Sequence, residues 1–170
     1  MAAGREEAFM VAHVAEWIKN KKLLSLFCFF CALVAADRIT KLAAISFFAR
    51  VSRNSGVSFG MLTGSEPRLL IFLNLAAAIF LLFMIFTMRR RPMPLLAGVA
   101  AMLAGAVGNL ADRIIYCHVV DWMPLPFLNG QFFSGFFPSG LAVNLADLYL
   151  ITGALVVFVA LVKGVFSELK

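Results

Sequence analysis

Two aspartates, each beside apolar residues, are the residues with the clearest capacity for chemistry. Asp121 lies in the run Val119-Val120-Asp121-Trp122, and Asp147 ends the run Asn144-Leu145-Ala146-Asp147. Two adjacent carboxylates share one proton, because both cannot ionise cheaply. The ionised member takes a proton from water, while the neutral member hydrogen-bonds a carbonyl and later helps to protonate a leaving amine. We therefore predict an aspartic-protease pair formed by Asp121 and Asp147.

The other common catalytic sets are missing from this sequence. His118 is the only histidine expected near the two aspartates, so a Ser-His-Asp arrangement has no support. A zinc site needs three or four suitable ligands, and no such cluster is apparent. We expect no metal and no cofactor.

A helix face in residues 104–121 carries the residues that we expect to support the pair. Its members recur at spacings of three and four, which places them on one side of a helix. They are Gly105, Gly108, Asn109, Asp112 and Arg113. Because polar groups face lipid only at high cost, this face should point into the protein. Asp37, Asn54 and Asn144 should lie at a similar depth.

Composition places these residues in a membrane protein. The chain of 170 residues is 62% hydrophobic and 14% charged, with a mean hydropathy of +0.94; soluble domains have roughly 25% charged residues. The net charge of +6 comes from basic residues beside apolar runs. Such residues set topology and contact anionic lipid, so we expect membrane lipid, and no nucleic acid, as a partner.

The apolar runs predict an all-α integral membrane protein with one domain. A spanning helix needs about 20 residues, and four spans fit at about 23–45, 67–88, 95–116 and 143–162. We expect 1–22 to be an amphipathic cytoplasmic leader with a short interfacial helix, 23–163 to be the membrane domain, and 164–170 to be a cytoplasmic tail. A secretory signal with its core at 23–36 is the alternative, but the long charged leader argues against it.

Two segments should join the spans at the outer face. Gly and Asn in residues 46–66 suit tight turns or short strands, so we predict a small β-containing segment there. Residues 117–143 are rich in Phe, especially at 127–137, with Pro and Gly between. We predict a loop or short helix at the membrane surface before the fourth span.

Charge predicts the topology. With four spans, the main basic clusters all fall on one side: Lys19, Lys21, Lys22, Arg89, Arg90, Arg91, Lys163 and Lys170. By the positive-inside rule this side is cytoplasmic, and Arg50 and Arg53 on the other side weaken the bias without reversing it. Both termini should therefore be cytoplasmic, and the candidate site should lie at the extracytoplasmic face.

Five motifs in order resemble those of the bacterial lipoprotein signal peptidases (signal peptidase II). They are Asp37-Arg38-Ile39-Thr40-Lys41, Asn54-x-Gly56-x-Ser58-Phe59-Gly60, Gly108-Asn109-x-x-Asp112-Arg113, Val119-Val120-Asp121-Trp122 and Asn144-x-Ala146-Asp147. The resemblance covers about residues 23–163. It implies catalytic roles for Asp121 and Asp147. It implies supporting or substrate-binding roles for Asp37, Asn54, Gly56, Asn109, Asp112, Arg113, Asn144 and Ala146.

The same resemblance implies the substrate and the location. It implies an aspartyl endopeptidase of the bacterial inner membrane, acting on prolipoproteins whose lipobox cysteine carries diacylglycerol. Cleavage on the amino side of that cysteine would release the signal peptide, and we expect a monomer. Several residues depart from the family pattern: Arg38 replaces the usual glutamine, and Ala104, Ser58, Trp122 and Leu148 are also atypical.

Two interpretations from other classes are weaker. A small proton- or ion-coupled transporter could use Asp37, Asp112 and Asp147 as a relay, but such proteins show internal repeats, and none is evident. A structural subunit could hold Asp112 and Arg113 as a simple ion pair, since charges within membranes pair in any case. That interpretation does not account for Asp121 and Asp147.

Overall fold

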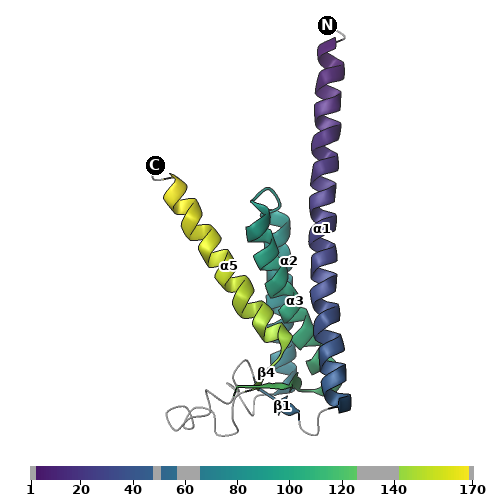
Figure 1. Ribbon diagram of the computed structural model, residues 1–170, viewed down its shortest axis with the longest axis vertical. Helices are drawn as coiled ribbons and strands as arrows, with labels where there is room; N and C mark the ends of the chain where they lie inside the picture. The colour runs from purple at the N-terminus through teal and green to yellow at the C-terminus, as the bar shows by residue number, and fades with distance from the viewer. Residues whose placement is uncertain (1–2, 48–50, 57–65, 126–141, 169–170) are drawn as a thin grey trace.

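The computed structural model describes residues 3–47, 51–56, 66–125 and 142–168, with only the helical backbone described for 3–20 and 165–168. The described part contains long helices joined by short strands (Figure 1). The helices are α1 (Ala3–Phe47), α2 (Pro67–Thr87), α3 (Met93–Tyr116) and α5 (Leu145–Glu168). The strands are β1 (Ser52–Asn54), β2 (Val119–Asp121), β3 (Met123–Pro124) and β4 (Ala142–Val143).

Helix α3 is the centre of the bundle and packs against α1, α2 and α5. In Figure 1 it lies between α1 and α5, and α5 leans away from it toward the C-terminal end. About two thirds of the apolar window of α3 is buried (67%), against 17% for α2. The buried residues of α3 include Gly105, Gly108, Asn109, Asp112 and Arg113. The prediction that this face points into the protein is therefore confirmed.

Glycines bring α3 and α5 close together. A Cβ atom added to Gly98 would lie 3.0 Å from the carbonyl oxygen of Gly153, and one added to Gly153 would lie 2.6 Å from that of Gly98. A Cβ on Gly105 would overlap the carbonyl oxygen of Ala146. Small residues allow two helix backbones to approach in this way. The start of α5, where Asp147 lies, is thus held directly against α3.

Short strands cover the end of the bundle that carries the candidate site. Strands β1 and β2 pair antiparallel, with Ser52 opposite Asp121 and Asn54 opposite Val119. Strands β3 and β4 form a second antiparallel pair. Between α3 and β2, Cys117 adopts a left-handed conformation with φ of 61° and donates its N–H to the carbonyl of Arg113. The chain turns there at once into the strand that holds Asp121.

The predicted fold class is confirmed: four helices in the described part are long and apolar enough to cross a membrane. Their candidate spans are Lys21–Phe47, Pro67–Thr87, Met93–Tyr116 and Leu145–Gly164. The β-containing segment after the first span is present as β1. The predicted loop or short helix before the fourth span falls mostly on 126–141, outside the described residues, and the described β2, β3 and β4 were not predicted.

The N-terminal leader differs from the prediction. We expected a short helix ending at Lys22, but α1 continues without a break from Ala3 to Phe47. No Gly or Pro follows Gly4 in this helix, so nothing in the sequence interrupts its hydrogen bonding. The leader is thus the first part of one long helix.

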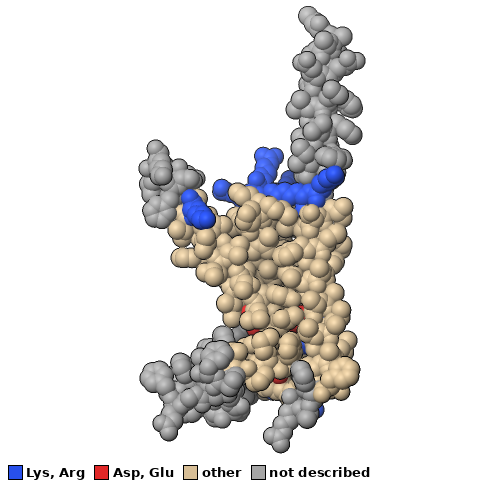
Figure 2. Space-filling view, viewed as in Figure 1, with Lys and Arg blue, Asp and Glu red and all other residues tan. Residues whose placement is uncertain are grey.

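Basic residues gather at the end of the bundle away from the strands. Figure 2 shows a band of Lys and Arg there, near α1, the α2–α3 turn and the tip of α5. This band, the basic end, comprises Lys21, Lys22, Arg89, Arg90, Arg91 and Lys163. The Lys22 Nζ donates to the carbonyl oxygens of Arg89 at 3.2 Å and Arg91 at 2.6 Å, which ties α1 to the α2–α3 turn.

Candidate active site

Asn144 and Asp147 fix the beginning of α5. The backbone N–H of Asp147 donates to Asn144 Oδ1 at 3.0 Å, and the N–H of Asn144 donates to Asp147 Oδ2 at 3.3 Å. This reciprocal pair has the geometry of a capping box, in which two otherwise unpaired donors of the first turn are satisfied. The Asp147 side chain is 9% exposed. Its position is therefore set by the helix that carries it.

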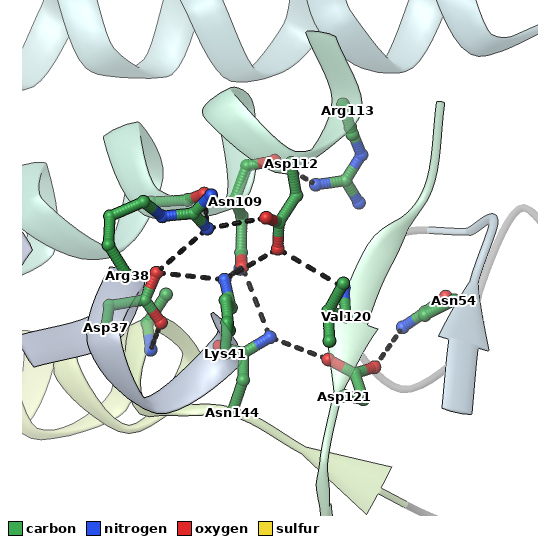
Figure 3. Close-up of polar contacts among 12 residues, drawn as sticks. Asp37, Arg38, Lys41, Asn54, Asn109, Asp112, Arg113, Val120, Asp121 and Asn144 are labelled. Atoms are coloured by element: carbon green, nitrogen blue, oxygen red, sulfur yellow. Dashed lines mark hydrogen bonds and ion pairs between the residues drawn. The ribbon is translucent and has the colours of Figure 1, made fainter. Parts of the chain in front are cut away.

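Asp121 is held by amides from two other segments. The Nδ2 of Asn54 on β1 donates to Asp121 Oδ2 at 3.0 Å, and the Nδ2 of Asn144 donates to Asp121 Oδ1 at 2.6 Å. The residue is only 2% exposed. Because each carboxylate oxygen accepts a bond, the side chain has a defined orientation (Figure 3).

Two asparagines connect the aspartates. Asn144 touches both: its side chain donates to Asp121, and its backbone exchanges the capping bonds with Asp147. Asn109 on α3 donates from Nδ2 to Asp147 Oδ1 at 2.9 Å and accepts from Asn144 Nδ2 at 3.2 Å. Neutral amides can orient two carboxylates without supplying charge. Asp121 and Asp147 therefore belong to one hydrogen-bonded group.

A buried ion network lies next to this group. Lys41 Nζ is within 3.0 Å of Asp37 Oδ2 and 2.8 Å of Asp112 Oδ2, and it donates to Asn109 Oδ1 at 3.1 Å. Lys41 is 1% exposed, and Asp37 and Asp112 are fully buried. Arg38 adds a second cation that contacts both aspartates. Two acids and two bases thus neutralise one another, three of them buried and Arg38 partly exposed.

The network reaches both candidate catalytic residues. Asp112 Oδ2 accepts the backbone N–H of Val120 at 3.2 Å, one residue before Asp121. Lys41 contacts Asn109, which in turn donates to Asp147. Lys41 is thus linked to Asp121 through Asp112 and strand β2, and to Asp147 through Asn109.

Asp37 also holds the start of α5. Its Oδ1 accepts the backbone N–H of Ala146 at 3.1 Å. A carboxylate at the first turn of a helix satisfies a free donor and interacts favourably with the helix dipole. Ala146 and Asp37 leave no space for a side chain at Gly108 on α3. A Cβ added to Gly108 would lie 3.2 Å from the Ala146 Cβ and 2.6 Å from Asp37 Oδ2.

Arg113 does not pair with Asp112 in the described part of the chain, so the simple ion pair considered for a structural subunit is wrong. Instead its Nη2 donates to the carbonyl oxygen of Gly56 at 2.6 Å, and its Nη1 to that of Asn109 at 3.4 Å. The N–H of Gly56 donates to Asn54 Oδ1 at 2.9 Å. Arg113 therefore fixes the turn that carries Asn54.

Asp121 lies outside the spans, and its surroundings alter its acidity. Burial, with a further contribution from the negative charge of Asp147, raises the pKa of Asp121 to about 7. Hydrogen bonds from Asn54 and Asn144 act in the opposite direction. The free protein thus holds a proton on Asp121 up to near-neutral pH.

The structure brings the predicted site residues into one contiguous set of contacts from α1, β1, α3, β2 and α5 (Figure 3). The four-residue spacing of Asp37 and Lys41 indicates an ion pair from sequence alone, and the structure confirms it at 3.0 Å. The sequence indicates no role for Arg38 and no contact of Lys41 with Asp112 or Asn109. Ser58 falls outside the described residues. No group of three or more His, Cys, Asp or Glu that could hold a metal ion occurs in the described ranges.

Comparisons with known proteins agree with this architecture. The family described as signal peptidase (SPase) II matches residues 29–163. A lipoprotein signal peptidase of Bartonella henselae is 32% identical over 122 residues, covering 68% of this chain and 71% of the relative. One from Clostridium novyi is 28% identical over 144 residues, covering 76% and 92%.

A solved structure shares the fold. A bacterial membrane enzyme determined by the in meso method at 2.3 Å resolution superposes with a TM-score of 0.67 at 21% identity, covering 82% of this chain and 88% of that one. With most of its length matched by the family model, this chain is a multi-pass inner membrane protein that belongs to the signal peptidase II family, whose members remove signal peptides from lipoproteins.

Proposed function

We propose that the chain is an aspartyl endopeptidase that cleaves diacylglyceryl-modified prolipoproteins on the amino side of the lipidated cysteine. The observation that carries this proposal is the contact of Asn144 with both Asp121 and Asp147. It joins two buried carboxylates from different elements into one group. Such a pair can activate water without a metal.

The two aspartates would have different roles. Asp121, with its raised pKa, is the neutral member and donates a hydrogen bond to the scissile carbonyl. Asp147, at the first turn of α5, is the ionised member, because a helix N-terminus favours negative charge. It takes a proton from water as the water oxygen attacks the carbonyl carbon. The C–N bond then breaks, and the cysteine amine receives a proton from the pair.

The supporting residues would maintain this geometry. Asn109 and Asn144 orient the aspartates, and Asn54 holds Asp121 from the strand side. Arg113 anchors the Asn54 turn at Gly56. One chain supplies both aspartates and all these contacts, which supports action as a monomer.

The placement of the site supports a lipid-anchored substrate. The site lies at the end of the bundle opposite the basic end. By the positive-inside rule, this arrangement supports a site at the extracytoplasmic face and both termini in the cytoplasm. A signal helix and two acyl chains could remain in hydrocarbon while the bond at their boundary reaches the site. Each buried CH₂ contributes about 0.8 kcal/mol, so the acyl chains would anchor the substrate strongly. Anchoring also sets the depth of the bond, which is a proximity effect.

The test compares one purified precursor with and without diacylglycerol on its cysteine, in the same nanodisc and with no added metal. We expect cleavage of the lipidated form by the wild type, and its loss in Asp121→Asn and Asp147→Asn. Glu66→Gln is the matched control, because Glu66 is an exposed carboxylate without a side-chain cap bond. Equal cleavage of both precursor forms would refute the lipid-dependent part. Full activity of either aspartate variant would refute the aspartyl mechanism.

A further inference from the structure

We propose that Arg38 is a positioning residue that sets the place of Asp121 by orienting Asp112. This inference rests on the proposed function, in which Asp121 is catalytic. Arg38 touches neither Asp121 nor Asp147 in the described structure; its effect would pass through Asp112 and the backbone of β2.

Arg38 joins α1 to α3 through one nitrogen. Its Nη2 donates to Asp112 Oδ1 at 2.5 Å, to the carbonyl oxygen of Gly108 at 3.1 Å and to Asp37 Oδ2 at 3.3 Å. The side chain is 25% exposed, while both aspartates are fully buried. Hydrogen bonds that involve two ions are the shortest and strongest of those in proteins. The bond to Asp112 is therefore the main contact of Arg38.

The two carboxylate oxygens of Asp112 contact different partners. Oδ1 accepts from Arg38, whereas Oδ2 contacts Lys41 at 2.8 Å and accepts the N–H of Val120 at 3.2 Å. Figure 3 shows Asp112 between the two cations on one side and Val120 on the other. Without Arg38, Oδ1 would have no donor among the residues that the structure describes, and the carboxylate could turn toward Lys41. The bond to Val120 would then lengthen, and Asp121 would move with the strand.

Charge gives a second consequence. Asp37 and Asp112 are balanced by Arg38 and Lys41, so loss of Arg38 leaves one net negative charge close to the catalytic pair. The charged groups around Asp121 are Asp147 on α5, Lys41 on α1, and Arg113 and Asp112 on α3. An added net negative charge disfavours ionisation of a carboxylate. The alkaline limb of the pH–rate profile, which the proposed mechanism assigns to Asp121, should therefore move to higher pH when Arg38 is neutralised.

The experiment uses Arg38→Met and Arg38→Lys in the full chain, with Arg90→Met as the control, because methionine carries neither a charge nor a hydrogen-bond donor. Arg90 is exposed at the basic end, so its variant removes one positive charge far from the site. With a lipidated precursor, we expect Arg38→Met to lower kcat about 10-fold and to leave KM within about twofold, because a displacement below about 1 Å misplaces the catalytic group without touching the substrate. Arg38→Lys keeps a cation with three donors and should restore most of kcat and the original pH profile.

A readout that needs no activity separates this inference from the proposed function. Hydrogen exchange of the Val120 amide should be faster in Arg38→Met than in wild type, Arg38→Lys or Arg90→Met. If wild type does not cleave the precursor, the proposed function fails, and the exchange rates alone decide the role of Arg38. Wild-type exchange and kcat in Arg38→Met would overturn the inference. Equal impairment of Arg38→Met and Arg38→Lys, or an unshifted pH profile in Arg38→Met, would also overturn it.

Discussion

The substitution Gly105→Ala tests whether the close contact of α3 with the start of α5 places Asp147. The new Cβ would lie 2.8 Å from Leu150 Cγ and would overlap the carbonyl oxygen of Ala146. Carbon atoms prefer separations of about 3.5–4.0 Å, so α5 must move away by at least about 0.7 Å. The residue after Ala146 is Asp147.

A displacement of this size should reduce activity more than stability. The bond from Asn109 to Asp147 is 2.9 Å, and lengthening it by about 0.7 Å exceeds the usual hydrogen-bond range. Since a misplacement of about 1 Å can cost roughly 100-fold in rate, we expect kcat to fall between about 10- and 100-fold. Overpacking of this kind typically costs about 1–3 kcal/mol, so the protein should still fold.

The assay measures kcat with a lipidated precursor, together with Tm in the same nanodisc. Gly164→Ala is the matched control: it lies on α5, the helix that Gly105 contacts, and a Cβ there would meet nothing within 4 Å. Both substitutions change helix propensity equally, so a difference between them reports the contact alone. A folded Gly105→Ala protein with kcat within about twofold of wild type would refute the argument that this contact places Asp147.

Three further results are expected. Asp121 loses its proton as pH rises through about 7, and the proposed mechanism needs that proton, so kcat/KM should fall above this pH. The negative charge of Asp147 contributes to the raised pKa, so isotope-edited infrared titration of Asp147→Asn should show a lower pKa for Asp121. An unchanged pKa of Asp121 would contradict this electrostatic coupling between the two aspartates. Lys41→Met leaves two buried carboxylates with one cation and should lower the free energy of unfolding by about 3–5 kcal/mol, measured by denaturation in detergent; a loss below about 1 kcal/mol would contradict a central role for Lys41. Asn144→Ala removes a cap worth about 0.5–2 kcal/mol and also the donor to Asp121, so kcat should fall far more than Tm, and a proportionate loss of both would argue for capping alone.

The sequence predicts the helices and the buried face of α3 well, because each rests on a local pattern. Hydropathy over about 20 residues marks the spans, and the spacing of Gly105, Gly108, Asn109 and Asp112 marks one face. Asn144-x-x-Asp147 also carries the spacing of a capping box, and this spacing accounts for the position of Asp147.

The missed features depend on contacts between distant segments. Strands β2, β3 and β4 have only two or three residues, too few for an alternating pattern to emerge. Arg38 and Asp112 are 74 positions apart, and no local rule pairs them. Arg113, next to Asp112 in sequence, was the obvious candidate for a partner. Adjacent residues on a helix point in different directions, and in the structure Arg113 points to Gly56 instead.

The ion network between α1 and α3 also bears on how the protein is made. Helix α1 is synthesised first, and Asp37 and Lys41 can neutralise each other within it, as they are four residues apart. Arg38 has its main counterion, Asp112, only when α3 arrives 74 residues later. A lone arginine in a span costs about 2.5–3.5 kcal/mol during insertion. Docking of α3 onto α1 supplies the counterion and removes that cost. We therefore expect α1 to stay near the insertion machinery until α3 enters the bilayer.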